Sequence, residues 1–278
     1  MAVTDDRRGG AAARPALGGV GGHFGAPHPN HAPHLNHALR LENVTRVFGA
    51  LTAIEDVSFS VAAGERRAVI GANGAGKTTL FNVVTGDFPA THGRVLFFGE
   101  DVTTMPPHER IRMGMRRTYQ SSLLFRELTV RDNLFLAVRG VSRNRFSFIR
   151  TSRNGPTDEL LERVRLTQVA DHPVAALSHG QQRQLEIGMA LAGAPRLILF
   201  DEPAAGLSPG ERAELVALLR GLPAHMGFVL IEHDLDIALR VVDRVTVMHN
   251  SRVLKHGSPA EIENDAEVQS IYMGERVH

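Results

Sequence analysis

The chain has 278 residues, a hydrophobic fraction of 43% and a net charge of +1, with 31 basic and 30 acidic side chains and no cysteine. This composition excludes wholesale disorder, a generally cationic nucleic-acid binder, and any disulfide or thiolate chemistry. No apolar run reaches the ~18–20 residues that span a bilayer, so any membrane role is expected to be peripheral. Only two basic residues are lysines, Lys77 and Lys255, and a lysine kept in so arginine-rich a chain points to a position that arginine cannot fill.

Two segments lack the periodicity of helices and strands. Residues 1–38 are rich in Gly, Ala, Pro and His, and we expect a disordered tail because they cannot bury enough apolar area to offset their conformational entropy. A metal-binding tract is the alternative for its five histidines, which are His23, His28, His31, His34 and His37. Segment 139–155 carries five arginines without regularly interleaved aromatics, so we expect a solvated loop rather than a surface for RNA or lipid head groups.

From residue 39 onward, strand and helix patterns follow one another. The first part predicts a helix over 77–84 and strands at 39–47, 57–61, 66–71 and 94–98. The region of about 106–193 predicts mainly helices, at 130–138, 157–167 and 180–193. The last part predicts strands at 197–201, 227–231 and 244–248 and helices at 209–221, 235–241, 259–264 and 266–272. This alternation predicts an α/β fold with a mostly parallel sheet, into which the middle helices are inserted.

A glycine-rich loop follows the predicted strand at 66–71. Its sequence, which fits the pattern G-x-x-x-x-G-K-S/T, is Gly71, Ala72, Asn73, Gly74, Ala75, Gly76, Lys77, Thr78 and Thr79. The glycines allow the backbone N–H groups to point at phosphate oxygens, and the following helix adds its N-terminal dipole. Lys77 offers a compact ammonium to the β- and γ-phosphates, and Thr78 offers a hydroxyl to Mg²⁺. The strand–loop–helix order favours a nucleotide-binding loop over a plain glycine turn.

Two acidic residues, Asp201 and Glu202, end the apolar strand predicted at 197–201. Carboxylates at the carboxyl end of a parallel strand lie at the crevice where ligands bind. We expect Asp201 to hold Mg²⁺ through water and Glu202 to orient and polarise the attacking water. A solvated acidic turn is the alternative, which the upstream glycine loop disfavours.

A third motif resembles the LSGGQ signature of the ATP-binding-cassette ATPases, and it consists of Leu177, Ser178, His179, Gly180, Gln181 and Gln182. Other positions match that family in order, namely Phe48 (the aromatic that stacks on adenine), Gln120 (the Q-loop), residues 205–208 (the D-loop) and His233 (the switch histidine). The resemblance implies a P-loop NTPase core with an antiparallel β portion near the N-terminus and a helical subdomain inserted at about 106–193. The cassette would span 39–275.

The resemblance also implies roles for single residues. Lys77, Glu202 and His233 would be catalytic, Phe48 and Gln120 would join the glycine loop in binding ATP, and Thr78, Gln120 and Asp201 would hold Mg²⁺. The signature residues Ser178, His179, Gly180 and Gln181 would reach the γ-phosphate of ATP bound to the opposite cassette of a head-to-tail dimer. Ser178 and Gln181 also form a capping-box pattern, so a merely well-capped helix is the alternative. His179 for the second glycine and Ser208 for the usual D-loop Asp depart from the family.

A single cassette without spanning helices resembles the separate ATPase subunit of a bacterial importer. Finer resemblance to the branched-chain amino acid and urea/amide importer group lies in residues 117–120, 124–125, 128–130, 180–187, 203–207 and 271–275. The implied partners are membrane permease subunits, which would dock on the helical insertion near the Q-loop, a second identical or related cassette and, indirectly, a solute-binding protein. This places the chain at the cytoplasmic face of the membrane, without nucleic acid. The implied function is ATP binding and hydrolysis that powers the uptake of branched-chain amino acids or a related amino acid or amide. The alternatives are a urea or short-chain amide importer ATPase, an ATPase acting on nucleic acid, and a non-hydrolysing scaffold.

Overall fold

The computed structural model describes residues 37–119, 124–141 and 155–275. All of them belong to one unit of the chain, His34–His278, which is separate from Met1–Pro33. Positions 1–36 of the tail expected over 1–38 therefore lie outside the described residues. Gln120 and most of the arginine-bearing segment 139–155 also lie outside them. The expectation was wrong at the tail's end: strand β1 (His37–Phe48) already begins at His37, because Ala38 is fully buried and His37 pairs with Ala62 of the neighbouring strand.

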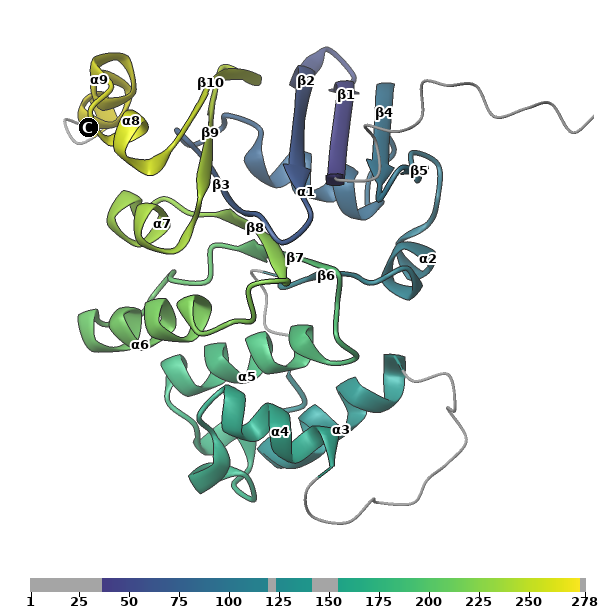
Figure 1. The fold of residues 1–278 in the computed structure, drawn as a ribbon, viewed down its shortest axis with the longest axis vertical. Coiled ribbons are helices and arrows are strands. Elements are labelled where there is room, and N and C mark those ends of the chain that lie inside the picture. Colours follow the sequence, from purple (N-terminus) through teal and green to yellow (C-terminus); the bar gives the residue numbers. More distant parts are fainter. Residues whose placement is uncertain (1–36, 120–123, 142–154, 276–278) are drawn as a thin grey trace, which may run out of the picture. The chain divides into compact units, whose positions relative to one another are not determined.

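A small antiparallel sheet forms one layer of this unit, as expected for the N-terminal part (Figure 1). Its strand order is β2-β1-β4-β5, with β2 (Leu51–Ala62), β4 (His92–Phe97) and β5 (Glu100–Asp101) beside β1. The buried side chains of β1, including Leu39 and Leu41, pack into a core shared with helix α1 (Lys77–Thr85). The sheet thereby covers the helix that carries Lys77.

A larger, mostly parallel sheet lies beneath it, with the order β10-β9-β3-β8-β7-β6. Its members are β3 (Arg66–Gly71), β6 (Met115–Arg117), β7 (Leu197–Asp201), β8 (Gly227–Ile231), β9 (Arg244–His249) and the antiparallel β10 (Arg252–Gly257). Every residue of β7 and β8 is buried, as expected for strands covered on both faces. Along β7, Leu197 and Leu199 join the core with α1, whereas Ile198 and Phe200 join the core with the helices on the other face.

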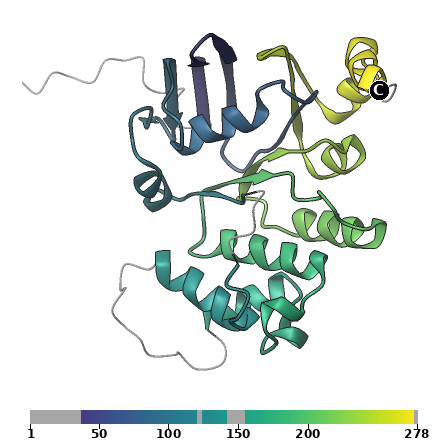
Figure 2. The ribbon, with the colours of Figure 1, turned by 180° about the vertical axis from the view of Figure 1, so that it is seen from behind.

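The remaining helices cover that second face and one end of the sheet (Figures 1 and 2). They are α2 (Pro107–Arg112), α3 (Val130–Val141), α4 (Pro156–Arg163), α5 (His179–Leu191), α6 (Pro209–Arg220), α7 (Leu235–Val241), α8 (Pro259–Glu263) and α9 (Ala266–Glu275), with short 3-10 turns at Thr167–Val169 and Val174–Ala176. The range of about 106–193 expected to be helical also contains β6, which pairs in parallel with β7. Three residues, of which two are arginines, are too few to show a strand period.

The parallel register aligns the ends of the central strands. Val69 of β3 and Asp201 of β7 both pair with Ile231 of β8. The loops that follow these three strands therefore meet at one edge of the sheet, where a ligand crevice is expected in an open α/β fold.

Candidate nucleotide-binding and catalytic site

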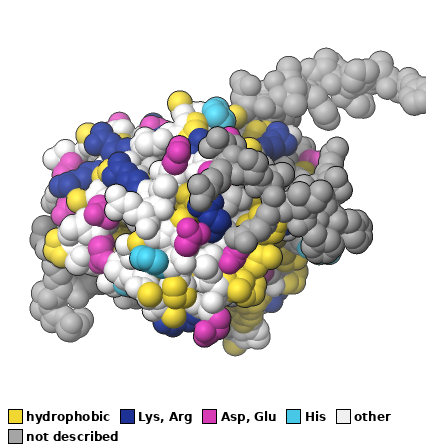
Figure 3. All heavy atoms as spheres, turned by 90° about the horizontal axis from the view of Figure 1, so that it is seen from below, with side chains coloured by type: hydrophobic (Ala, Val, Ile, Leu, Met, Phe, Trp, Pro, Cys, Tyr) yellow, Lys and Arg dark blue, Asp and Glu magenta, His cyan; other side chains and the backbone are white. Residues whose placement is uncertain are grey.

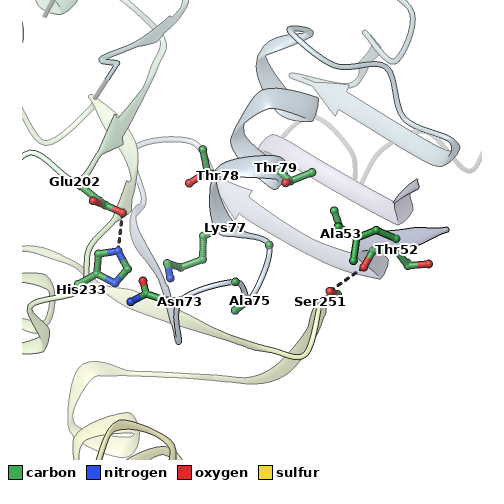
Figure 4. A pocket seen from close by; sticks show the side chains of 13 residues that line it. Thr52, Ala53, Asn73, Ala75, Lys77, Thr78, Thr79, Glu202, His233 and Ser251 are labelled. Atoms are coloured by element: carbon green, nitrogen blue, oxygen red, sulfur yellow. Dashed lines mark hydrogen bonds and ion pairs between the residues drawn. The ribbon is translucent and has the colours of Figure 1, made fainter. Parts of the chain in front are cut away.

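A cavity of about 310 Å³ opens at this edge of the sheet (Figure 4). It is lined by Leu51, Thr52, Ala53, Asn73, Gly74, Ala75, Gly76, Lys77, Thr78, Thr79, Glu202, His233 and Ser251. The structure thus brings most of the glycine loop together with Glu202 and His233. Phe48, Gly71, Ala72 and Asp201 do not line the cavity. The cavity is also lined by Leu51, Thr52 and Ala53 of β2 and by Ser251, for which the sequence offers no signal.

The glycine loop curls where side chains would not fit. A Cβ at Gly71 would lie 2.2 Å from the Met248 carbonyl oxygen, and one at Gly76 would lie 2.4 Å from the Ala53 carbonyl oxygen. Gly76, with a φ of +95°, is also the N-cap of α1 and, as a glycine, supplies no side-chain cap to this helix end. The N–H groups at a helix N-terminus favour an anion, so the loop is suited to phosphate.

Lys77 is buried within this loop, with only 5% of its surface exposed. Its Nζ donates to the carbonyl oxygens of Gly71 at 2.6 Å and Ala72 at 2.9 Å. A broad, planar guanidinium would crowd this position, which is shaped for a compact ammonium. The loop therefore holds a positive charge in place beside the N-terminus of α1.

Glu202 and His233 meet over the cavity. The Oε1 atom of Glu202 lies 2.6 Å from Nε2 of His233, and the two residues follow β7 and β8 (Figure 4). Glu202 has a φ of +48°, a left-handed conformation that disfavours residues with a Cβ. A carboxylate that can accept a proton, next to an imidazole that fixes its direction, is the arrangement that orients and polarises a water molecule.

Asp201 lies below the cavity in an ion pair that the sequence did not predict. Its Oδ2 accepts from Nη2 of Arg117 at 2.7 Å, and Arg117 also contacts Asp87 and Asn82. Burial raises the pKa of Asp201, while the hydrogen bond and charge of Arg117 oppose that shift. The other oxygen, Oδ1, is buried and has no partner among the described residues.

That unpartnered oxygen and the exposed Thr78 hydroxyl fit Mg²⁺, which is bound by oxygen ligands and retains several waters. Thr78 would hold the ion directly and Asp201 through water. Within the described ranges no three His, Cys, Asp or Glu side chains form a metal cluster, and a nucleotide-bound Mg²⁺ needs none.

Glu232 is a second buried acid that the sequence did not single out, although it directly precedes His233. Burial raises its pKa to about 7, against hydrogen bonds from the N–H groups of Ala204, Asp234 and His233. These hydrogen bonds connect Glu232 to the two loops that carry Glu202 and His233.

The signature residues form the N-terminus of α5, on the far side of the loop after β7. The Ser178–Gln181 capping box is present as expected: Ser178 Oγ accepts the Gln181 N–H at 3.2 Å, and Gln181 Oε1 accepts the Ser178 N–H at 3.0 Å. His179 Nε2 lies 3.3 Å from the Ala205 carbonyl oxygen of the D-loop. None of these residues lines the cavity of their own chain.

A carboxylate of the same chain occupies this helix end. Glu211 Oε1 accepts the Gly180 N–H at 2.8 Å and the Ser178 hydroxyl at 3.3 Å, while Oε2 accepts the Ser208 N–H at 3.0 Å. These hydrogen bonds, those from Ser208 first, lower the pKa of Glu211 to about 2. The spacing of Ser208 and Glu211 could have predicted the capping box of α6, but not the contact with α5.

Phe48 lies beside the cavity's β2 rim rather than in its lining. It is 37% exposed, and the guanidinium of Arg46 lies 4.3 Å from its ring centroid. The ring of Phe88 lies nearly perpendicular to it, with the ring centroids 5.3 Å apart. Since Arg46 covers one face of the ring, a planar ligand would stack on the other.

Comparison with known proteins identifies the family of the chain. A family model described as "ABC transporter" matches residues 54–205. The high-affinity branched-chain amino acid transport ATP-binding protein BraF of Pseudomonas aeruginosa is 35% identical over 244 residues, covering 84% of this chain and 96% of that protein. The corresponding protein LivG of Escherichia coli is 36% identical over 240 residues, covering 82% and 94%. The ADP conformation of an ATP-binding cassette of an ABC transporter superposes with a TM-score of 0.76 at 34% identity, covering 86% of this chain and 99% of that one.

Proposed function

Since the chain belongs to the ABC transporter family, as an ATP-binding cassette that hydrolyses ATP, we propose that it powers an importer for branched-chain amino acids or a related amino acid or amide. The similarity to BraF and LivG, which are branched-chain amino acid transport ATP-binding proteins, supports this solute class. The observation that carries the proposed mechanism is the 2.6 Å contact between Glu202 and His233 at the mouth of the glycine-loop cavity.

In the proposed mechanism the residues of this chain hold ATP and Mg²⁺ and orient and polarise the attacking water. The loop at 71–79 would bind the phosphates of ATP through its N–H groups and the ammonium of Lys77. Mg²⁺, held by Thr78 and by Asp201 through water, would neutralise charge on the β- and γ-phosphates. Glu202 would orient the attacking water and accept its proton, and His233 would fix the carboxylate and contact the γ-phosphate.

The signature residues would serve a second cassette, identical or related. They do not line the cavity of their own chain, so we expect ATP bound at 71–79 not to contact them within one molecule. In a head-to-tail pair, the N-terminus of α5 would instead meet the γ-phosphate held by the partner. ATP would then join the two cassettes, and its hydrolysis would let them separate.

An apolar groove of about 250 Å³ supports the docking of a permease. It lies between α2, β6 and the helices α3 and α5, and is lined by Ile111, Arg116, Arg117, Thr118, Tyr119, Leu124, Ala137, Val141, Glu186, Met189 and Ala190. Ile111 and Tyr119 expose 42% and 37% of their surface, and Arg117 links the groove to Asp201. Figure 3 shows the end of the molecule with the helical insertion, where hydrophobic side chains lie among charged ones.

No helix in the described residues is long and apolar enough to cross a membrane. Under the proposal, the chain is held at the cytoplasmic face by its permease and is coupled only indirectly to a solute-binding protein.

The test of this function has two parts. Glu202→Gln should retain MgATP binding and lower turnover by at least about 100-fold, since it removes the group that accepts the proton. Unchanged turnover would rule out Glu202 in this role. Affinity purification of the tagged chain should recover a permease, and the bound solute of the accompanying binding protein would separate branched-chain amino acids from urea or short-chain amides. Recovery of nucleic acid without a permease would contradict the proposal.

A further inference from the structure

Glu232 connects the two loops that carry Glu202 and His233. It follows β8 and is 3% exposed. Its Oε1 accepts the Ala204 N–H at 2.7 Å, and its Oε2 accepts the His233 N–H at 3.2 Å. The Asp234 N–H bonds to the same carboxylate. One side chain therefore holds the main chain on both sides of the catalytic pair.

The position is unfavourable for a carboxylate. Burial is the main cause that raises the pKa of Glu232, and the nearby charge of Glu202 raises it further. No lysine or arginine of the described chain forms an ion pair with it, so only backbone N–H groups compensate for its desolvation. A buried carboxylate without a cation costs folding free energy, which indicates a role in the site rather than in the core.

The backbone at Glu202 needs such a restraint. Its φ of +48° is sparsely populated for a residue with a Cβ, and such conformations persist where the surroundings fix them. The N–H of Glu202 donates to the Ile231 carbonyl oxygen at 3.0 Å, just before Glu232. Two residues after Glu202, the N–H of Ala204 is held by Glu232 itself. The end of β8 thus fastens the chain on either side of Glu202.

We propose that Glu232 is a positioning residue for ATP hydrolysis: its carboxylate fixes the Ala204 and His233 main chains so that the Glu202 carboxylate and the His233 imidazole meet. This rests on the proposed function of the Glu202–His233 pair. Glu232 does not line the cavity, so it acts through these two residues and leaves nucleotide binding to the glycine loop.

The experiment compares Glu232→Gln with wild type in equilibrium MgATP binding and in steady-state turnover. Gln keeps the size of the side chain, but its NH₂ group would face a backbone N–H and separate the loops. We expect kcat to fall by about 10- to 100-fold, as for an angstrom-scale misplacement, with the Kd for MgATP within about twofold of wild type. An unchanged kcat, or a parallel loss of kcat and binding, would overturn the proposal.

A second readout separates positioning from a structural role. In a Glu202→Gln background, adding Glu232→Gln should change the residual turnover by less than about twofold, because the residue acts through Glu202. A structural role would lower turnover equally in both backgrounds. Failure of the proposed function would look different, since the Glu202→Gln variant alone would then keep wild-type turnover.

The matched control is Glu65→Gln. Glu65 also accepts a backbone N–H, from Ala62 at 2.9 Å, and pairs with Arg67 at 2.6 Å, but it precedes β3 at the opposite edge of the sheet, away from the cavity. Its kcat and Kd should equal those of wild type. If Glu232→Gln does not fold, Glu232→Asp keeps the charge on a shorter side chain and should still lower kcat at unchanged Kd. Wild-type kcat in Glu232→Asp would then overturn the proposal.

Discussion

The two half-sites that the proposed function assigns to phosphate are built in opposite ways. In the loop at 71–79, the buried ammonium of Lys77 is held by two carbonyl oxygens, and within the described structure the end of α1 has no side-chain cap. At the N-terminus of α5, the carboxylate of Glu211 accepts the Gly180 N–H and the Ser178 hydroxyl. One half-site offers a positive charge, whereas the other carries a negative one.

This difference assigns the two half-sites to different steps. Under the proposed function, a single chain would bind nucleotide at 71–79, because Lys77 and the N-terminus of α1 already line the cavity. Under the same proposal, the α5 end would bind a phosphate only after Glu211 gives up its hydrogen bonds there, so it would act later, when a second cassette supplies the phosphate. Changes in the first half-site should therefore alter affinity, and changes in the second should alter turnover alone.

Lys77→Ala should have the largest effect. Loss of the ammonium removes the charge that the first half-site offers to the phosphates, so ATP turnover at a fixed, subsaturating ATP concentration should fall by at least about 100-fold. The control is Lys255→Ala, which changes the other lysine, an exposed partner of Asp265. Equal turnover in the two variants would contradict the role of the Lys77 ammonium in the first half-site.

Gly180→Ala should lower turnover by about tenfold. Its new Cβ would lie 2.5 Å from the present position of Glu211 Oε1, so it would also crowd a phosphate oxygen that accepts the Gly180 N–H there, which weakens one hydrogen bond to a charged group. Gly210→Ala is the matched control, since nothing lies within 4 Å of a Cβ there and α6 should gain slightly in stability. Wild-type kcat in Gly180→Ala would show that the α5 end takes no part in catalysis.

Phe48→Ala should raise the KM for ATP about fivefold at unchanged kcat, which corresponds to the loss of roughly 1 kcal/mol of base stacking. Phe48→Tyr keeps the ring and should behave as wild type. A change in kcat rather than KM would remove Phe48 from the nucleotide-binding half-site.

The smallest effect is on the pH dependence of stability. In the folded state the pKa of Glu211 is lowered from 4.5 to about 2, so below pH 4.5 the unfolded chain binds more protons than the folded one. The contribution of Glu211 is present above pH 4.5 and is lost as the pH falls toward 2. Urea unfolding between pH 5 and pH 3 should show a shallower decline for Glu211→Gln than for wild type. Equal slopes would contradict the hydrogen bonds at the α5 end.

The sequence predicted the first half-site better than the second for a physical reason. The features of the loop at 71–79 are local: a buried strand, glycines at the turns, a lysine and a helix follow one another along the chain. The contacts of Glu211 with Gly180, Glu232 with Ala204, and Arg117 with Asp201 join residues 31, 28 and 84 positions apart. Such contacts depend on strand register and helix packing, which a local pattern does not specify.

The same limit explains the smaller differences in the fold. Strand β6 was not predicted, because its role comes from pairing with β7 rather than from its own three residues. Phe48 is partly exposed, as stacking on a base requires. The sequence did not indicate that Arg46 covers one face of its ring and that Phe88 packs beside it. The α/β architecture and the α5 capping box, which do depend on local periodicity and spacing, were predicted correctly.

The most direct test of the two-step assignment is equilibrium binding of MgATP to wild type, Lys77→Ala and Gly180→Ala under identical conditions. Gly180→Ala should bind with a Kd within about twofold of wild type, whereas Lys77→Ala should bind at least about 30-fold more weakly, as expected when one partner of a buried charge pair is removed. Wild-type affinity in Lys77→Ala, or an equal loss in both variants, would contradict the division of the site into a half that binds nucleotide and a half that acts later.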